Sequence, residues 1–370
     1  MSKQLFATPG LAMLIALALS LIICLYAKPI GRALKVMDDP DEHRKHHSQS
    51  TPLVGGMAIM LPWALWSCAS FFLFPSGSTG FQEAILLCGL GVAVIGFADD
   101  QSGTLPLGRT LSVLIFLMIA FIIEPGFIAP SLDWGSFEPT TILPGIYCAL
   151  MAFSVIGLVN AVNMADGQNG VVSSMFVIWS LCLTLVTKGT LDSAVILLGL
   201  SFVALLFNIR GKLFLGDCGS YGVTFVLALL SMWVYAKGIV NIETLIVWFF
   251  IPVADCLRLI ISRPMRGLSP FAGDRDHFHH RVHAKLGERF SLVTYIGMVA
   301  GTSLFSTLMP HLSLVCVVVL TAFYFSYAWL TDPPELRLAH QDHSQADALG
   351  ERGSDVVPLR RSAKNHSHDK

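Results

Sequence analysis

Acidic residues that could bind a metal ion collect in short polar segments between long apolar runs. They are the Asp99-Asp100 pair, Asp166 and Asp217, the last two each beside a glycine. Carboxylates without neighbouring cysteines suit a hard cation such as Mg²⁺, which binds one or two acids together with substrate phosphates. Glycine turns also let backbone N–H groups approach a phosphate. These residue types indicate phosphoryl transfer, in which catalysis is mostly positioning and charge neutralisation.

Amide and basic side chains in other polar segments complete this set. Arginine and histidine suit phosphate oxygens. Each segment alone also has a plain structural explanation, because a pair of acids can mark a water boundary, an asparagine can cap a loop and a histidine run can be a solvated basic loop. The set as a whole favours chemistry. Its members are Lys45, Asn160, Asn163, Asn208, Arg275, His277, His279 and His280.

The elements that must position these residues are strongly apolar. The 370-residue chain is 54% hydrophobic and only 13% charged, about half the usual charged fraction of a soluble domain. A helix needs roughly 20 apolar residues to cross a bilayer, and lipid offers the backbone no hydrogen-bond partner. We therefore expect an all-α, polytopic membrane protein. Eleven transmembrane helices are predicted at 9–27, 55–74, 82–98, 109–128, 143–159, 171–187, 192–207, 220–236, 242–260, 291–309 and 313–331.

The distribution of lysine and arginine predicts the orientation of these helices. One side holds 21 of the 24 basic residues, in loops at 28–54, 99–109, 160–170, 208–219 and 258–290 and in the tail. By the positive-inside rule this side is cytoplasmic, with the N-terminus outside and the C-terminus inside. Residues 1–331 are then a transmembrane domain with cytoplasmic active-site loops. Residues 332–370 are polar, rich in charge, and predicted to be disordered.

Five motifs in these loops resemble those of a known family. In chain order they are Arg44-Lys45-x-His47 with Pro52-x-x-Gly55-Gly56, Asp99-Asp100, Asn160-x-x-Asn163-x-x-Asp166-Gly167, Phe214-x-Gly216-Asp217-x-Gly219-Ser220, and Asp274-Arg275-x-His277-x-His279-His280. Together they resemble the polyprenyl-phosphate N-acetylhexosamine-1-phosphate transferases of glycosyltransferase family 4. The histidine motif and the Arg-Lys-x-His loop are most similar to the bacterial undecaprenyl-phosphate GlcNAc-1-phosphate transferase branch.

This resemblance implies a reaction and a set of partners. A phosphate oxygen of undecaprenyl phosphate would attack the β-phosphorus of a UDP-N-acetylhexosamine, with UDP-GlcNAc the first choice, and release UMP. The cofactor would be Mg²⁺, with Mn²⁺ as an alternative. The enzyme would lie in the bacterial inner membrane with its active site facing the cytoplasm, and its product would begin a cell-surface polysaccharide such as an O-antigen. No nucleic-acid partner is expected, and a homodimer is left open.

The resemblance also implies a role for each site residue. The metal would be held by Asp217, with Asp100 as a second ligand. Catalytic roles are expected for Asp99, Asp100, Asp166 and His279. Substrate would be bound by Lys45, Asn160, Asn163, Asn208, Arg275, His277 and His280. For Asn208, nine residues before Asp217, a role as a structural cap is an equal alternative.

One position departs from the family pattern, and other functions stay open. Bacterial members commonly have Asp-Gly-x-Asp-Gly in the third loop, where this chain has Asp166-Gly-Gln-Asn169-Gly. Asparagine keeps an oxygen ligand but loses a charge, so the role of position 169 is undecided. A transporter or flippase, a transferase for another UDP-sugar and a non-catalytic relative are the competing hypotheses.

Overall fold

The computed structural model describes residues 7–39, 50–73, 79–103, 105–129, 131–135, 138–265 and 288–331. In these ranges the chain is almost entirely helical, as predicted. The helices are α1 (Ala7–Leu25), α2 (Ala27–Leu34), α3 (Gly55–Leu73), α4 (Thr79–Ser102), α5 (Pro106–Ile123), α6 (Pro144–Ala165), α7 (Val171–Val186), α8 (Asp192–Asn208), α9 (Gly216–Ala236), α10 (Ile242–Met265), α12 (Glu288–Leu308) and α13 (Ser313–Thr331).

Short elements connect these helices. Two 3₁₀ turns, η1 (Pro125–Phe127) and η2 (Pro310–Leu312), precede α6 and α13. Strand β1 (Met37–Asp38) pairs antiparallel with β2 (Thr51–Pro52), and β3 (Ser131–Leu132) pairs antiparallel with β4 (Thr140–Thr141). Residues from Tyr324 onward belong to a second unit, whose described part completes α13.

Each predicted transmembrane segment coincides with a helix of the described chain. By length and composition, seven helices could cross a membrane: α3, α4, α6, α9, α10, α12 and α13. Helices α1 and α2 together also pass this test, with a 77° bend at their junction, and α5, α7 and α8 are shorter apolar helices. Large apolar side chains such as Leu14, Val94, Ile115 and Phe153 stay exposed on the helix surfaces, which fits contact with lipid. The chain is thus a polytopic all-α membrane protein.

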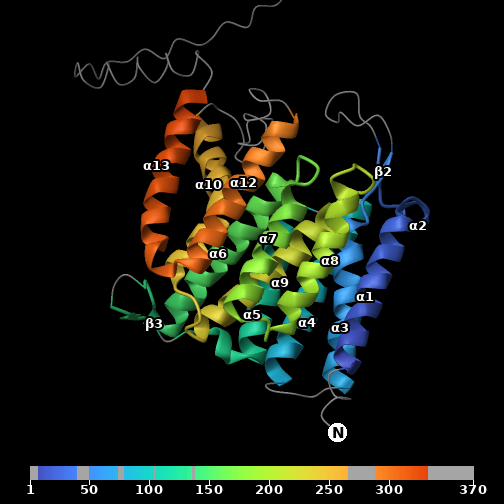
Figure 1. Ribbon diagram of the computed structural model, residues 1–370, viewed down its shortest axis with the longest axis horizontal. Coiled ribbons are helices and arrows are strands. Elements are labelled where there is room, and N and C mark those ends of the chain that lie inside the picture. The colour runs from blue at the N-terminus through green and yellow to red at the C-terminus, as the bar shows by residue number, and fades with distance from the viewer. Residues whose placement is uncertain are drawn as a thin grey trace, which may run out of the picture. The chain divides into compact units, whose positions relative to one another are not determined.

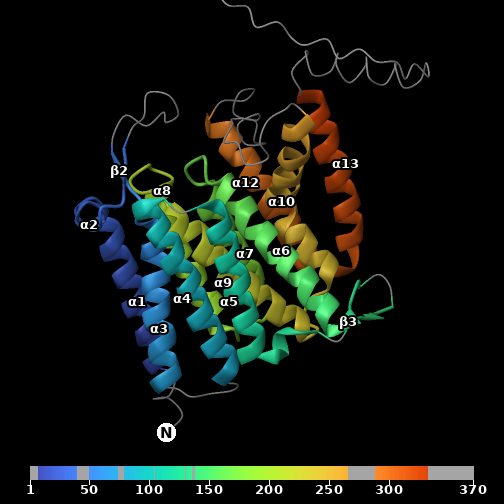
Figure 2. The same ribbon diagram turned by 180° about the vertical axis from the view of Figure 1, so that it is seen from behind.

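Helix α9 is the centre of the bundle. It packs against α3, α4, α6 and α7, and 94% of its apolar span is buried. Figure 1 shows α1, α3 and α8 side by side, and Figure 2 shows α4, α5 and α6 from behind. Because α9 is surrounded, residues at its first turn can be reached by side chains from several helices that are far apart in sequence.

Several helices extend further than the apolar pattern predicted. Two predicted loops began at 99 and 160, but α4 continues to Ser102 and α6 continues to Ala165. A third predicted loop ended at 219, but α9 already begins at Gly216. The hydropathy pattern ends at the first polar residues, whereas the helical backbone continues where those polar side chains find partners. The expected loop residues Asp99, Asn163 and Asp217 therefore lie on terminal helical turns, which hold side chains more rigidly than loops do.

Candidate functional site

Asp217 lies in the first turn of α9, where a glycine sets the chain direction. Gly216 has a φ of +68°, a conformation that side chains with a Cβ rarely adopt. The carboxylate of Asp217 is bound on both oxygens. Oδ1 accepts a hydrogen bond from Asn163 Nδ2 at 2.6 Å, and Oδ2 accepts one from Arg109 Nη1 at 2.9 Å. Asp217 is therefore held by residues from α5 and α6.

Asp100 fixes the start of α9 from the end of α4. Its Oδ1 accepts the backbone N–H of Asp217 at 2.7 Å, and its Oδ2 accepts that of Cys218 at 3.0 Å. The first N–H groups of a helix have no partner within the helix, and the helix dipole favours a negative charge there. An acid at the C-terminal end of α4, unfavourable for α4 itself, is thus favourable for α9. The geometry gives Asp100 a positioning role, and its role as a metal ligand stays a prediction.

Arg109, in the first turn of α5, joins two acids of different helices. Its Nη1 donates to Asp99 Oδ2 at 2.7 Å and to Asp217 Oδ2 at 2.9 Å. The side chain of Asp99 is 7% exposed and that of Asp217 is 22% exposed, so the two negative charges are only partly solvated. The guanidinium also lies 5.8 Å from the ring centroid of Tyr221, within cation–π range. One cation thus neutralises two carboxylates that are 118 positions apart in the chain.

Arg109 was not among the site residues predicted from the sequence. It lies at the boundary of the transmembrane helix predicted at 109–128. One signal could have identified it, because Arg109 is the only basic residue in the predicted inner loop that carries Asp99-Asp100. A lone cation beside an acidic pair, at a bilayer boundary, is a natural counter-ion for that pair.

The amides and the remaining acid lie along the end of α6. Asn163 donates both to Asp217 and to Ser220 Oγ, the latter at 2.9 Å, so it links α6 to the first turns of α9. Asn160, one turn earlier, donates to the carbonyl of Ile156 in its own helix at 2.8 Å. Asp166 is the C-terminal cap residue of α6 and is partly buried. Burial, and then the negative charge of Asp100, raise the pKa of Asp166 to about 7.

Asn208 is buried, and its hydrogen bonds are made within the protein. Its Oδ1 accepts from the N–H of Gly170 and from Ser173 Oγ, both at 2.8 Å, and its Nδ2 donates to the carbonyl of Leu213 at 3.0 Å. These bonds join the end of α8 to the start of α7 and to the segment before α9. The arrangement favours the cap role, one of the two alternatives that the sequence left open.

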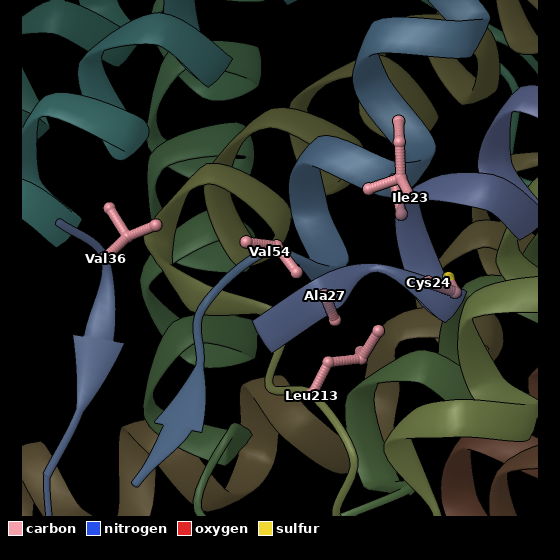
Figure 3. Packing of buried hydrophobic residues seen from close by; sticks show 7 residues of the cluster. Ile23, Cys24, Ala27, Val36, Val54 and Leu213 are labelled. Atoms are coloured by element: carbon pink, nitrogen blue, oxygen red, sulfur yellow. The ribbon is translucent and has the colours of Figure 1, made fainter. Parts of the chain in front are cut away.

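The Pro52-x-x-Gly55-Gly56 motif holds the segment before Asp217 in place. Phe214 donates its N–H to the carbonyl of Pro52 at 2.9 Å, and Gly55 and Gly56 donate theirs to the carbonyls of Phe214 and Leu215, both at 2.8 Å. A buried apolar cluster supports this contact. Figure 3 shows its side chains from α1, α2 and the segments before β1, α3 and α9, namely Ile23, Cys24, Ala27, Val36, Val54 and Leu213.

Some predicted site residues lie outside the described residues: Lys45, Arg275, His277, His279 and His280. Their expected roles therefore stay predictions. Within the described ranges, Asp255 and Arg258 form an ion pair at 3.0 Å along α10, as the spacing of three positions allows.

The donor atoms of the site fit a hard divalent cation. No group of three or more acid, histidine or cysteine side chains forms a ready metal site within the described ranges. However, Mg²⁺ usually takes only one or two carboxylates and obtains its other ligands from water and substrate phosphates. Asp99 and Asp217 already direct one oxygen each at a single positive centre, the Arg109 Nη1. A cation that entered with the substrate could bind these same two oxygens.

Fold and site together define a polytopic membrane protein with a carboxylate-rich site at one end of its helices. Residues 83–235, which include Asp99, Asn163 and Asp217, match the sequence model described as glycosyl transferase family 4. This match confirms the resemblance predicted from the motifs.

Curated proteins from several bacteria are similar over most of their length. The probable undecaprenyl-phosphate N-acetylglucosaminyl 1-phosphate transferase of Bacillus subtilis is 27% identical, covering 77% of this chain and 80% of the relative. The undecaprenyl-phosphate alpha-N-acetylglucosaminyl 1-phosphate transferase of Salmonella typhi is 26% identical, covering 83% and 87%. The decaprenyl-phosphate N-acetylglucosaminephosphotransferase of Mycobacterium leprae is 27% identical, covering 73% and 77%.

Proposed function

We propose that this protein transfers N-acetylglucosamine 1-phosphate from UDP-GlcNAc to undecaprenyl phosphate and releases UMP. The observation that carries the proposal is the meeting of Asp99, Arg109, Asn163 and Asp217, from four helices, around two carboxylates that share one positive charge. The similarity to transferases that bear this activity in their names supports the choice of sugar and lipid. An all-helical bundle that can cross a membrane supports a lipid as one substrate.

The proposed reaction is a direct displacement at phosphorus. An oxygen of undecaprenyl phosphate forms a bond to the β-phosphorus of UDP-GlcNAc, while the bond from that phosphorus to the bridging oxygen of UMP breaks. The phosphate monoester is already largely ionised near neutral pH, so no covalent enzyme intermediate is needed. When bound, Mg²⁺ neutralises charge on the diphosphate oxygens.

The residues of the site would position and neutralise charge in this reaction. Asp217 and Asp99 would hold the cation, which would supply positive charge beside the diphosphate. Arg109, which pairs with both acids in the structure, would help to neutralise the diphosphate oxygens. Asn163 keeps the second oxygen of Asp217 oriented, and Asp100 keeps the first turn of α9 in place. Asp166, whose pKa is near neutrality, would contribute to the substrate pocket beside Asp100.

The membrane orientation belongs to the same proposal. Asp99, Asn163 and Asp217 lie on the predicted side that holds 21 of the 24 lysine and arginine residues, most of them in 28–54, 258–290 and the tail, and this excess supports a cytoplasmic location for the site. UDP-sugars are cytoplasmic metabolites, so the donor would be available on that side. We propose a bacterial inner membrane location, with a product that initiates a cell-surface polysaccharide.

The test is to incubate the purified full-length protein with undecaprenyl phosphate, Mg²⁺ and a panel of UDP-sugars in detergent. Mass spectrometry of the lipid fraction should detect undecaprenyl diphosphate linked to N-acetylglucosamine, with an equal amount of UMP in the aqueous fraction. If a lipid-linked product formed only with a different UDP-sugar, that UDP-sugar would be the donor instead of UDP-GlcNAc. A protein that forms no lipid-linked product from any UDP-sugar, and yet moves a lipid-linked sugar across vesicles, would instead be a transporter.

A further inference from the structure

Helix α2 turns away from the direction of α1 at the end of that apolar helix. The two helices meet at Tyr26 with a bend of 77°. Leu25 and Tyr26, at the bend, are 62% and 60% exposed. An exposed tyrosine beside an apolar helix is typical of the boundary between lipid and water. We therefore place α2 at a membrane–water boundary.

This boundary lies on the same side of the bundle as the site around Asp217. Gln101, next to Asp100 in the last turn of α4, donates its Nε2 to the carbonyl of Leu34 in α2 at 2.9 Å. Helix α2 also contacts strand β2, and Figures 1 and 2 show these two elements together at one end of α1. Helix α2 thus lies at the end of the bundle that holds the carboxylates.

The buried side of α2 is apolar and packs closely against the protein. Ala27 belongs to the cluster shown in Figure 3, and Ile30 and Leu34 pack against that cluster. Gly31 is also buried, and a Cβ built on it would lie 2.7 Å from Pro52 Cβ. Helix α2 is therefore firmly attached to β2, whose Pro52 carbonyl accepts a hydrogen bond from the segment before α9.

The exposed side of α2 carries three cations, which we call its basic face: Lys28, Arg32 and the C-terminal cap residue Lys35. Their spacing of four and then three positions places them on one side of the helix. Residues 26–35 contain no acid, and within the described ranges no carboxylate pairs with the basic face. Lys35 has a φ of +58°, so the third cation stands at a position where glycine would be less strained.

We propose that the basic face of α2 binds the headgroups of anionic phospholipids such as phosphatidylglycerol. Lysine and arginine at a membrane boundary attract anionic lipids, and the basic face has three of them without a compensating acid. The acyl chains of the lipid would lie along exposed apolar side chains at the end of α1, such as Ile22 and Leu25.

The length of the basic face favours phospholipids over the single acceptor lipid. Lys28 and Lys35 are seven positions apart, which at 1.5 Å per residue separates them by about 10 Å along the helix. The face can therefore contact more than one headgroup, as a bilayer surface offers and one undecaprenyl phosphate does not. It shares no residue with the site around Asp217, so the proposal does not depend on the transfer reaction.

The experiment measures thermal unfolding of the full-length protein in neutral detergent. Phosphatidylglycerol, or phosphatidylcholine with the same acyl chains, is added in increasing amounts. Because α2 is attached to β2 and the apolar cluster, a lipid that binds α2 should raise the unfolding temperature. Phosphatidylglycerol should do so at a lower concentration than phosphatidylcholine, and added NaCl should weaken its effect.

Replacement of the basic face by glutamine isolates its contribution. Each cation beside an anionic lipid surface strengthens binding by about fivefold, so the combined Lys28→Gln, Arg32→Gln and Lys35→Gln variant should bind phosphatidylglycerol about a hundredfold more weakly. Arg32→Gln alone should lose about fivefold in affinity, and Arg32→Lys should bind like the wild type.

The matched control is Arg210→Gln, in the segment between α8 and α9. Arg210 is an exposed cation at the same end of the bundle, but its Nη1 donates to the carbonyl of Leu206 in the preceding helix. Arg210→Gln should bind phosphatidylglycerol like the wild type, because its charge does not belong to the basic face.

Four results would overturn the proposal. Equal protection by both phospholipids would exclude recognition of the anionic headgroup. Unchanged phosphatidylglycerol affinity in the combined variant, or in Arg32→Gln alone if the combined variant does not fold, would exclude the basic face. Equal losses in Arg32→Gln and Arg210→Gln would show a general effect of surface charge. Stronger protection by undecaprenyl phosphate, lost in the combined variant, would assign the basic face to the acceptor lipid instead.

Discussion

Replacement of Arg109 by alanine should destabilise the cation-free protein and strengthen its binding of Mg²⁺. The guanidinium satisfies Asp99 and Asp217 together, and Asp99 is 7% exposed. Breaking a fully buried ion pair costs about 3–5 kcal/mol, and a hydrogen bond to a charged group contributes about 1.5–3 kcal/mol. Because the side chain of Arg109 is itself 19% exposed, we expect a loss of about 2–3 kcal/mol in the free energy of unfolding.

Mg²⁺ should bind more tightly to Arg109→Ala because the arginine and the cation compete for one oxygen. Arg109 Nη1 occupies Oδ2 of Asp217, the oxygen that a cation would need. Removal of one charge-assisted hydrogen bond should therefore tighten Mg²⁺ binding by roughly tenfold or more. Added Mg²⁺ should then restore most of the lost stability. Turnover should still fall, because the group proposed to bind the diphosphate is gone.

The assay is thermal unfolding in detergent, with chelator and across a Mg²⁺ titration. The matched control is Arg258→Ala, which breaks the ion pair with Asp255 on α10. That variant should lose stability by an amount that Mg²⁺ does not restore. A second variant, Arg109→Lys, retains the charge and should bind Mg²⁺ like the wild type. Weaker Mg²⁺ binding in Arg109→Ala than in the wild type would refute the competition between arginine and cation.

Three further predictions concern the supports of the site. Asp100→Asn retains only one acceptor oxygen for the two N–H groups at the start of α9. We expect a loss of about 1 kcal/mol in the free energy of unfolding, measured by chemical denaturation, and a lower kcat. Gly216→Ala places a Cβ 2.6 Å from Asp100 Oδ2 at a φ of +68° and should lower the free energy of unfolding by at least about 1–2 kcal/mol. The control Gly108→Ala, with open space around it, should not destabilise the fold. The pKa of Asp166 is raised to about 7, so the folded state binds the extra proton, and the cation-free protein should lose stability as the pH rises from about 4 through about 7. Asp166→Asn should remove this dependence of the free energy of unfolding on pH between about 4 and about 7. An unchanged pH dependence in that variant would contradict the raised pKa.

The fold was largely predictable because lipid-spanning helices impose a strong constraint on sequence. Each predicted apolar run coincides with a helix, since uninterrupted apolar residues have few other stable arrangements in a bilayer. The helix ends were less predictable. Asp99, Asp100 and Asn163 were expected in loops, because polarity alone cannot show that a neighbouring helix will bind those side chains.

The site was predictable in its residues and less so in their contacts. The motifs identified Asp217 and Asn163, which the structure joins at 2.6 Å. The function of Asp100 as a cap for α9 depends on the packing of α4 against α9, which no local pattern contains. Arg109 belongs to no motif. Its position near Asp99-Asp100 suggests a counter-ion, but its contact with Asp217 depends on the packing of α5 and α9 around the site.

The most direct measurement is Mg²⁺-dependent release of UMP from UDP-GlcNAc by Asp217→Asn, with undecaprenyl phosphate as acceptor. Asparagine retains the shape of the side chain and can still accept from Asn163 or Arg109, so the protein should remain folded in detergent. UMP release should fall by at least about a hundredfold, the loss expected when a charge-stabilising group is removed from an active site. Near wild-type turnover in a folded Asp217→Asn protein would contradict the claim that these carboxylates hold the reacting diphosphate through a cation.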